Sequence, residues 1–569
     1  MNRRSFVIST ASAVSLGALG LTPFRLVAAS TTDSLVARLT AANDALIPDL
    51  LRRQNAAGAV TDAHGIKTVH DTSRLIAVLV AARHAPGSRY HRDDALIEPL
   101  ERAAAYMLSA QHADGTIDLI ATNFHSTPDT AFVVEVIAGV ASLLHREPDK
   151  AEATLRDSID QFLRRAGEAL IVGGVHTPNH RWVVSAALAR IHERFPDPRY
   201  LARIEQWLAE SIDLDPDGQY TEKSTSVYSP VVDRALLTVD RVLDRPALRD
   251  AVRRNLEMTL YYIHPDGEVV TEASKRQDKY QRGSMARYYY SYRTLARLDG
   301  DGRFAAMTAQ IERNAEKQLT GELLTFLEEP AFGGDLPAEQ ALPTDYPKVF
   351  AYSHLARIRR GRISGTVLAQ NSTLFSLRKG AAALEAVRFA SAFFGKGQFV
   401  GESLEVRDGS YHLEQKLTGP YFQPLSADQI AGGEHVRMAA NGTLAVGGRA
   451  ARAQSEVQQL TARAVVSEDA GRFRIAIELD GTDGVPVAVE LAFRHGGRLE
   501  GVVPVKDIAD AHLLKSGKGR YIVGEDTISF GPGRADHTWT QLRGALPKWD
   551  GQSVYLTGLT PFRLTLELS

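Results

Sequence analysis

Three helix starts of similar sequence recur along this chain at nearly constant spacing. A proline follows Ser or Thr at positions 128, 178 and 230, so the prolines lie 50 and 52 residues apart. Ser or Thr before Pro is typical of a helix N-cap and first turn, where the missing N–H of proline removes no hydrogen bond. An apolar run follows each proline. Because about 50 residues make one helical hairpin, the spacing predicts a repeat in which these three helices are equivalent.

A second marker has the same period. The turns Asp114-Gly115, Asp217-Gly218 and Asp266-Gly267 lie 103 and 49 residues apart, which is two hairpins and one hairpin. Helical periodicity continues from about residue 34 to 327, long enough for about six hairpins. We therefore expect an (α/α) toroid of inner and outer helices over residues 30–327, with an open solenoid as the alternative.

The character of the chain changes after this region. Residues 328–347 hold four prolines and a Gly-Gly pair, which predicts a linker. From residue 348 to 569 apolar and polar residues alternate with a period of two, and turns such as Asn441-Gly442 and Asp480-Gly481 separate the runs. The chain is therefore predicted to be an α+β multidomain protein, a toroid followed by an antiparallel β-sandwich.

The first 29 residues have the features of a targeting segment. Arg3-Arg4 precedes a short, mildly apolar stretch, and Val27-Ala28-Ala29 supplies small residues for a cleavage site. This resembles a bacterial twin-arginine export signal, which predicts a periplasmic or secreted mature protein that is not in a membrane. An ordinary secretory signal or a membrane anchor is the alternative.

Composition excludes several kinds of site. The chain has no cysteine, so it has no disulfide, thiolate metal site or cysteine nucleophile. Its net charge of −2 argues against a broad nucleic-acid surface, although a local basic cleft is compatible with that value.

Residues able to transfer or bind protons gather at the predicted helix starts. His125, His176 and Tyr228 precede the three prolines, and Asn179-His180 follows the second. If the helices are equivalent, these side chains lie along one rim of the toroid. We place the chemistry there.

The sequence around two of these starts resembles a known family. Asp217-Gly218 followed by Glu222, Ser224 and Tyr228 is similar to a pattern in polysaccharide lyases of the heparinase II/III type, and Asn179-His180 is similar to their Asn-His element. The family also has a toroid followed by a β-sandwich.

The resemblance implies cleavage of a uronic-acid glycan by β-elimination. Tyr228 would serve as base, acid or both, and Asn179 with His180 would neutralise the uronate carboxylate. His125 and His176 would share the proton transfer. In the alternative interpretation Tyr228 is a half-buried structural tyrosine, the histidines cap or pack against helices, and Asn179 is a capping amide.

A basic segment before the next helix, whose predicted cap is Ser284, supplies candidates for substrate binding. Arginine pairs with carboxylate or sulfate in a bidentate manner, whereas many charge runs are only solvated surface. The candidates here and at the neighbouring helix starts are Lys275, Arg276, Arg282, Tyr280, Trp182 and Glu222.

Two other functions remain open at this stage. One is a glycoside hydrolase on the same toroid, including an unsaturated uronyl hydrolase, which needs two carboxylates at the scissile bond. The available carboxylates are Asp118, Asp129, Glu222 and Glu272. The other is a glycan-binding protein without catalysis. The expected partner is in each case an acidic polysaccharide or oligosaccharide. No cofactor is expected, although the resemblance allows a structural metal in the β domain at His412 or His435.

Overall fold

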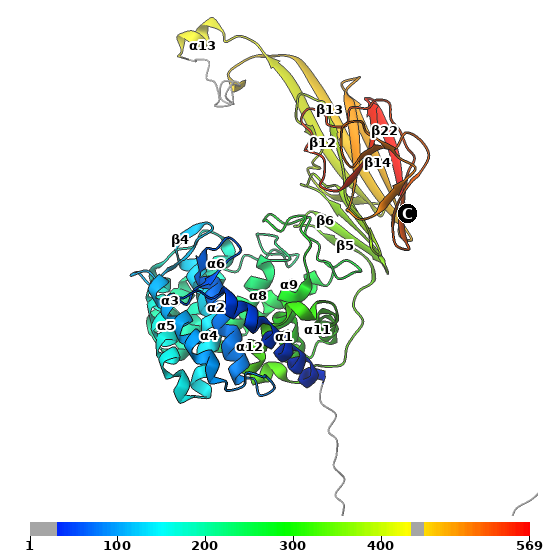
Figure 1. The fold of residues 1–569 in the computed structure, drawn as a ribbon. Coiled ribbons are helices and arrows are strands. Elements are labelled where there is room, and N and C mark those ends of the chain that lie inside the picture. The colour runs from blue at the N-terminus through cyan, green and yellow to red at the C-terminus, as the bar shows by residue number, and fades with distance from the viewer. Residues whose placement is uncertain (1–30, 434–448) are drawn as a thin grey trace, which may run out of the picture.

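The computed structural model describes residues 31–433 and 449–569. The predicted export segment, residues 1–29, lies outside them. The chain forms a helical domain followed by a β domain (Figure 1). The helices of the first domain are α1 (Thr31–Arg53), α2 (Val69–His84), α3 (Ile97–Ala110), α4 (Thr127–Arg146), α5 (Ala153–Val172), α6 (Pro178–Arg194), α7 (Pro198–Leu208), α8 (Tyr228–Leu243), α9 (Ala247–Thr259), α10 (Tyr289–Asp299), α11 (Gly302–Ala315) and α12 (Glu322–Glu328).

The helical domain is the predicted toroid. Each odd-numbered helix packs as an outer helix against the even-numbered inner helix beside it, and α2, α4, α6, α8 and α10 lie side by side in that order. Helix α12 packs against α1, α2 and α4, so the last inner helix meets the first hairpin. This closure excludes the open solenoid, and six hairpins complete the ring.

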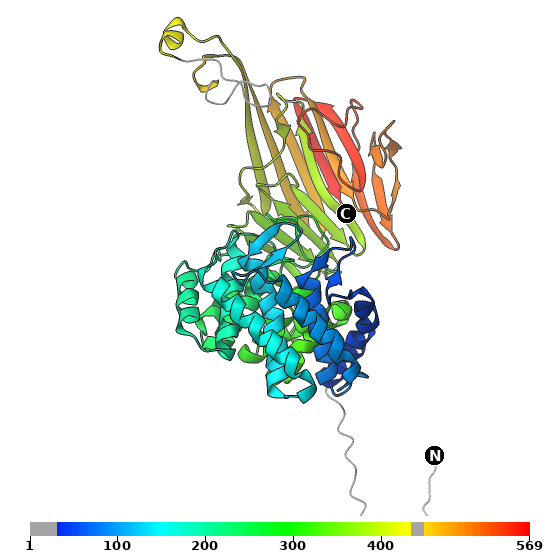
Figure 2. The same cartoon turned by 60° about the vertical axis from the view of Figure 1, so that its left-hand side comes forward.

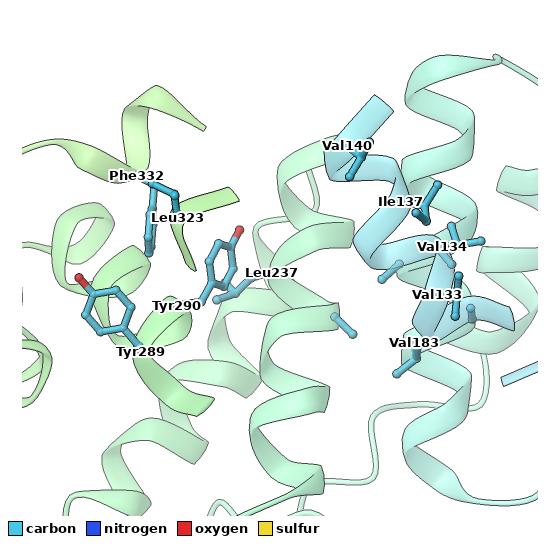
Figure 3. Packing of buried hydrophobic residues seen from close by; sticks show 14 of the residues in the cluster. Val133, Val134, Ile137, Val140, Val183, Leu237, Tyr289, Tyr290, Leu323 and Phe332 are labelled. Carbon is cyan, nitrogen blue, oxygen red and sulfur yellow. The ribbon is translucent and has the colours of Figure 1, made fainter. Parts of the chain in front are cut away.

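The core of this domain lies between the two rings of helices. Figure 3 shows Val133, Val134, Ile137 and Val140 along one side of α4, with Val183 of α6 close by. Of the helices that the structure describes, α4 alone is long and apolar enough to cross a membrane, and 78% of that stretch is buried. Its hydrophobicity therefore fits the position of a core helix between neighbours.

The same turn follows each of four outer helices. In residues 112–116 the His112 N–H donates to the Thr116 carbonyl (2.9 Å) and the Gly115 N–H donates to the His112 carbonyl (2.9 Å). The same two bonds recur in residues 55–59, 215–219 and 264–268. Glycine is required because φ lies between +86° and +90° in all four turns. The predicted Asp-Gly markers are therefore the junctions from outer to inner helices.

The three proline-marked starts lie in the first turns of α4, α6 and α8, but their caps vary. Ser126 caps α4, and its Oγ accepts from the Asp129 N–H (3.2 Å). Helix α8 begins at Tyr228, with Pro230 as its third residue, so Ser229 is not the cap that the sequence pattern predicts. Instead, the Tyr228 N–H donates to Ser224 Oγ (3.1 Å). The predicted cap Ser284 does accept from the Ala286 N–H, at the short 3-10 helix η3 (Met285–Tyr288) before α10.

Residues 328–347, predicted as a linker, contain the last residue of α12, a short 3-10 helix η5 (Pro330–Gly333) and the start of the first strand of the β domain. The strands are β5 (Asp345–Phe350), β6 (Leu355–Arg360), β7 (Ile363–Leu368), β8 (Phe375–Lys379), β9 (Ala382–Ser391), β10 (Gly397–Gln398), β11 (Glu405–Arg407), β12 (Ser410–Phe422), β13 (Gln454–Asp469), β14 (Arg472–Gly481), β15 (Pro486–Phe493), β16 (Arg498–Glu500), β17 (Val503–Pro504), β18 (Ala511–Leu513), β19 (Gly519–Val523), β20 (Asp526–Gly531), β21 (Gln552–Leu559) and β22 (Phe562–Leu568).

These strands form a sandwich of two sheets around one core. One sheet has the order β17-β18-β21-β15-β9-β8-β7-β6-β5, and the other β11-β12-β13-β14-β22-β20-β19-β16. Apolar residues of both sheets meet between them, for example Phe375 with Phe473. The neighbouring strands pair antiparallel as predicted, with the exception of β18 and β21, which run parallel. The long hairpin β12–β13 carries α13 (Ala427–Ala431) away from the toroid (Figures 1 and 2).

The β domain stands on the end of the toroid at which the inner helices begin (Figures 1 and 2). Buried Arg357 of β6 donates to the carbonyls of Tyr261 (3.0 Å) and Ile263 (3.3 Å), just after α9. Arg494 of the β domain forms a bidentate ion pair with Glu268 (2.8 and 2.9 Å). These contacts fix the sandwich over the loop that leads from α9 to α10.

Candidate active site

The predicted helix starts come together at one end of the toroid. The ring of His180, in the first turn of α6, lies edge-on to Phe132 of α4 at 6.1 Å and to His176 at 4.8 Å. Asn179, its neighbour, reaches Glu222 in the loop before α8. The starts of α4, α6 and α8 therefore form a continuous rim, on the side where the β domain docks.

Asn179 and Glu222 form a buried pair at the centre of this rim. Asn179 Nδ2 donates to both Glu222 oxygens (2.9 and 3.0 Å), and both residues are less than a tenth exposed. Burial raises the pKa of Glu222, against the opposing effects of the Asn179 hydrogen bond and the Arg276 charge. The side-chain oxygen of Asn179, Oδ1, is buried and has no hydrogen-bond partner within the described residues. The pair thus leaves the Asn179 Oδ1 atom available to accept a hydrogen bond, beside the Glu222 carboxyl group, whose pKa is raised.

Tyr228 is connected to this pair through Arg276, whose guanidinium lies over the Tyr228 ring and whose charge acts on Glu222. The Arg276 guanidinium carbon is 5.0 Å from the centre of the Tyr228 ring, and the amide of Gln277 donates to the Tyr228 hydroxyl (2.5 Å). Tyr228 is half-buried and is the first residue of α8. The phenol oxygen is therefore held by a donor, near a cation and at the positive end of a helix dipole.

His176, just before α6, and His180, in its first turn, differ in environment. His180 is buried, and its Nδ1 has no hydrogen-bond partner in the part of the chain that the structure describes. Burial is the main reason that its pKa falls to about 4; the charges of His176 and Arg276 act in the same direction, and Asp129 opposes them. His176 is exposed. His180 is therefore neutral near pH 7, with a free ring nitrogen.

One further histidine joins the rim from α2. His70 Nε2 is 3.7 Å from Asp129 Oδ1, and burial lowers the His70 pKa. Asp129 also accepts hydrogen bonds from Ser126 Oγ (2.5 Å) and Asn123 Nδ2 (2.9 Å). His70 follows Thr68, the N-cap of α2, so it occupies the same position in its hairpin as Asn179 does in α6. The Thr68 cap two residues before His70 could have indicated this equivalence in the sequence, but α2 has no proline to mark its start.

Sequence reasoning also missed Lys223, which lies in the loop before α8, and His354, which lies in the β domain. Lys223 Nζ donates to the Tyr352 carbonyl (3.2 Å) in the turn between β5 and β6, and His354 lies in the same turn. Burial lowers the pKa of both Lys223 and His354, and the Lys223 charge contributes to the shift of His354. Both residues have a positive φ, +51° and +57°. A strained backbone of this kind is held only where the surrounding structure fixes it.

Lys275 and Tyr280 lie on this β-domain side of the rim. Lys275 is exposed, its N–H donates to the Glu222 carbonyl, and its charge contributes to the lowered pKa values of Lys223 and His354. The Tyr280 hydroxyl donates to Asn371 Oδ1 (2.6 Å), and its ring packs against Trp549 at 4.7 Å. Tyr280 is thus part of the domain interface.

Three predicted site residues lie apart from Tyr228. His125 is exposed on the hairpin β3–β4 (Ile117–Leu119 and Asn123–Ser126), stacked on His112 at 3.8 Å and bonded to Asp114 (2.7 Å). The Arg282 side chain is 72% exposed and has Glu268 as its neighbour, at 3.6 Å. Trp182 corrects a prediction: it is fully buried and its indole N–H donates to Asp213 (3.1 Å), so its ring cannot stack on a sugar.

The carboxylates needed for a hydrolase are mostly engaged elsewhere. Glu272 accepts from Ser376 Oγ (2.7 Å) across the domain interface, and Asp118 accepts from His112 and from the His125 N–H. Asp129 is held by Ser126 and Asn123. Of the four candidate carboxylates, Glu222 is the one whose pKa responds to the charge of Arg276, the residue that lies over the Tyr228 ring.

The candidate metal ligands do not form a site in the described part of the chain. His412 lies in β12, paired with Glu405 of β11 and Val465 of β13. No group of three or more His, Asp or Glu residues within residues 31–433 and 449–569 is arranged to hold a metal ion. His435 lies outside those residues.

The fold is shared with solved polysaccharide lyases. The sequence matches no family model and no curated protein. The structure is similar to heparinase III (TM-score 0.55, 11% identity, 93% of this chain and 82% of that chain). It is equally similar to the chondroitin AC lyase of Streptomyces coelicolor A3, solved with chondroitin sulphate (0.55, 13%, 97% and 80%). A xanthan lyase of Paenibacillus also matches (0.52, 10%, 95% and 59%). At these identities the likeness shows the architecture, a helical toroid followed by a β domain.

Proposed function

We propose that this protein is a polysaccharide lyase that cleaves a uronic-acid-containing glycan by β-elimination. The observation that carries the proposal is the meeting of two pairs at the rim, Asn179 with Glu222 and Tyr228 with Arg276. The likeness in fold to heparinase III and chondroitin AC lyase supports it, because those proteins are named for acidic glycans.

The reaction needs three groups. A base removes the C5 proton, the C5–H electron pair forms the C4–C5 double bond, and the C4–O4 bond breaks. An acid then protonates the departing O4. Because negative charge builds on the uronate carboxylate in the transition state, donors must face that carboxylate.

We assign the carboxylate-binding role to the buried pair. When protonated, Glu222 can donate a hydrogen bond to the uronate, and its raised pKa favours this form. Asn179 holds Glu222 and can turn its amide toward the substrate, while the Arg276 charge compensates the uronate.

We assign the proton transfer to Tyr228. The Tyr228 hydroxyl, at the start of α8, is positioned by the hydrogen bond from the Gln277 amide, and in this proposal it takes the C5 proton and returns it to O4. His180, neutral at pH 7, provides a second proton acceptor on the same rim, and exposed His176 stands beside it.

The test is the absorbance of the product. The new C4–C5 double bond absorbs in the ultraviolet, so we expect a rise in absorbance when the purified protein meets its polymer in a panel of glycosaminoglycans, alginate, glucuronan and bacterial exopolysaccharides. Tyr228→Phe should fold normally and lose turnover by about 10²–10⁴-fold. Tyr421→Phe is the matched control, since Tyr421 is exposed on β12 of the other domain.

Other outcomes identify the alternatives. New reducing ends without ultraviolet absorbance would show a hydrolase, and binding without turnover would show a glycan-binding protein. Near-normal turnover in Tyr228→Phe would remove Tyr228 from the mechanism. The proposed elimination uses side chains only, so treatment with EDTA should leave turnover unchanged.

We also propose that residues 1–29 direct export to the periplasm. N-terminal sequencing of the protein from a periplasmic fraction should then begin near residue 30. Replacing both arginines of the pair by lysine, Arg3→Lys together with Arg4→Lys, should keep the protein in the cytoplasm if the twin-arginine signal is used.

A further inference from the structure

A cavity lies on the axis of the toroid, below the rim. It has a volume of about 630 Å³ and is lined by residues of every inner helix from α2 to α12. That volume falls within the range of about 300–1,000 Å³ that is usual for small-molecule sites. Neither Tyr228 nor Asn179 lines it, so the cavity is distinct from the site described above.

The cavity is a pit with an upper and a lower end. Its upper lining includes Phe132, whose ring touches His180, and exposed Arg74 and Lys317. Its lower lining includes Arg190, which is buried and paired with Glu328. Exposure therefore decreases from the rim downward, and the pit opens on the same end of the toroid as the candidate active site.

The wall of the pit combines apolar surfaces with several polar and charged side chains. Phe132, Val183 and Val231 contribute apolar side chains, and the Tyr290 ring from α10 stands opposite (Figure 3 shows Val183 and Tyr290). Arg234 is already bonded to Glu322 (2.8 Å) and Thr325 (2.9 Å) of α12. Most of the charge on the wall is thus neutralised within the protein.

Glu135, on the same wall, has no ion-pair partner in the part of the chain that the structure describes. Its Oε1 is buried and has no hydrogen-bond partner within the described residues. The rest of the side chain is only partly buried, because it faces the pit rather than bulk solvent. Burial raises its pKa to about 7, against the charges of Arg190 and Arg234. An unpaired buried carboxyl oxygen costs free energy unless a ligand or water donates to it.

We propose that this pit binds a single uncharged sugar ring. The apolar and aromatic parts of the wall fit the C–H faces of such a ring, and Glu135 accepts a hydrogen bond from one of its hydroxyl groups. The positive charges of Arg74 and Lys317 at the mouth suit an acidic sugar that is linked to this ring in the same glycan. Because Arg190 in the lower lining is buried and paired with Glu328, the pit fits the end or a branch of a glycan better than its continuous middle. Binding here requires no turnover, and the inference does not depend on the proposed elimination.

The test is calorimetric titration of the full protein with glucose, galactose, mannose and N-acetylglucosamine. We expect one of these sugars to bind at one site per chain. Glu135→Gln should weaken binding at least about tenfold, since an amide NH₂ group takes the place of one of the two carboxyl oxygens. Ala77→Leu should abolish binding, because Ala77 lines the pit and a larger side chain fills it.

Controls separate the pit from stability and from the rim. Ala105→Leu makes the same change on the exposed face of α3 and should bind as the wild type does. Tyr228→Phe should bind the sugar normally although its turnover is lost, so failure of the elimination leaves this result intact. Failure of all four sugars to bind the wild type, or unchanged binding in Ala77→Leu, would overturn the proposal.

Discussion

At the scale of residues, the two arginines predicted to bind substrate are not equivalent. Arg276 lies over the Tyr228 ring, whereas Arg282 is exposed beside Glu268. We expect Arg276→Ala to lower kcat/KM by about ten- to a hundredfold, with the larger part in KM, because a charged contact to the substrate is lost. Arg282→Ala should change it less than about twofold. Equal effects in the two variants would place the substrate-facing cation elsewhere.

The dependence of KM on salt concentration is an independent test of the role of Arg276. Screening weakens an exposed electrostatic contact, so added salt should raise KM of the wild type more than that of Arg276→Ala. A parallel rise in both would show that Arg276 does not meet the charge of the substrate.

His180 predicts how stability depends on pH. Its pKa is lowered from 6.5 to about 4 in the folded protein, so below pH 6.5 the unfolded chain binds more protons at this site. Stability is therefore expected to fall between pH 6.5 and 4, by up to roughly 3 kcal/mol from this group. Thermal unfolding of His180→Gln over this range should show a shallower loss than the wild type. Identical slopes would show that His180 is not held in a buried neutral state.

At the scale of elements, the repeated turn makes a graded prediction. A Cβ on Gly115 would lie 2.1 Å from the Arg165 carbonyl oxygen of α5, whereas a Cβ on Gly267 would meet only the Asn314 side chain at 3.1 Å. Both glycines have a φ near +87°, so Ala at either position carries the same backbone strain of about 1–2 kcal/mol. We expect Gly115→Ala to lower Tm clearly more than Gly267→Ala, because overpacking against the backbone adds about 1–3 kcal/mol. Equal shifts in Tm would mean that the turn can move away from α5.

The elements were predictable where local chemistry determines them. The Asp-Gly turns and the period of about 50 residues are properties of neighbouring residues, and they indicate the toroid directly. The cap of α8 was not predictable, because Ser224 and Ser229 are both able to cap and packing decides between them. The parallel pair β18–β21 also escapes a sequence pattern, since a period of two does not encode strand direction.

At the scale of the whole molecule, the two domains are joined through Arg494. It pairs with Glu268 of the toroid and with Glu385 of its own domain (2.8 Å), and its side chain is 16% exposed. Arg494→Ala leaves Glu268 partly buried without this partner, so we expect the domains to separate more readily. Limited proteolysis should cut faster in residues 334–344. Arg463→Ala, which removes an exposed pair with Glu414, is the control and should be cut like the wild type.

The candidate site was predictable only on the toroid side. Asn179, His180 and Tyr228 stand at marked helix starts, so their register places them together. Lys223 and His354 depend on how the sandwich docks, and no local pattern reports a contact between residues more than a hundred positions apart. The burial of Trp182 follows from neighbouring helices in the same way.

The repeated turn also bears on the history of the chain. Four of the connections from an outer to an inner helix keep a turn with the same backbone bonds, while the helices between them have diverged in sequence and length. Core positions accept many apolar side chains of suitable volume, but a φ near +87° against a neighbouring carbonyl accepts little besides glycine. If the ring arose by duplication of one ancestral hairpin, that common descent would remain readable at the turns after it had faded from the core.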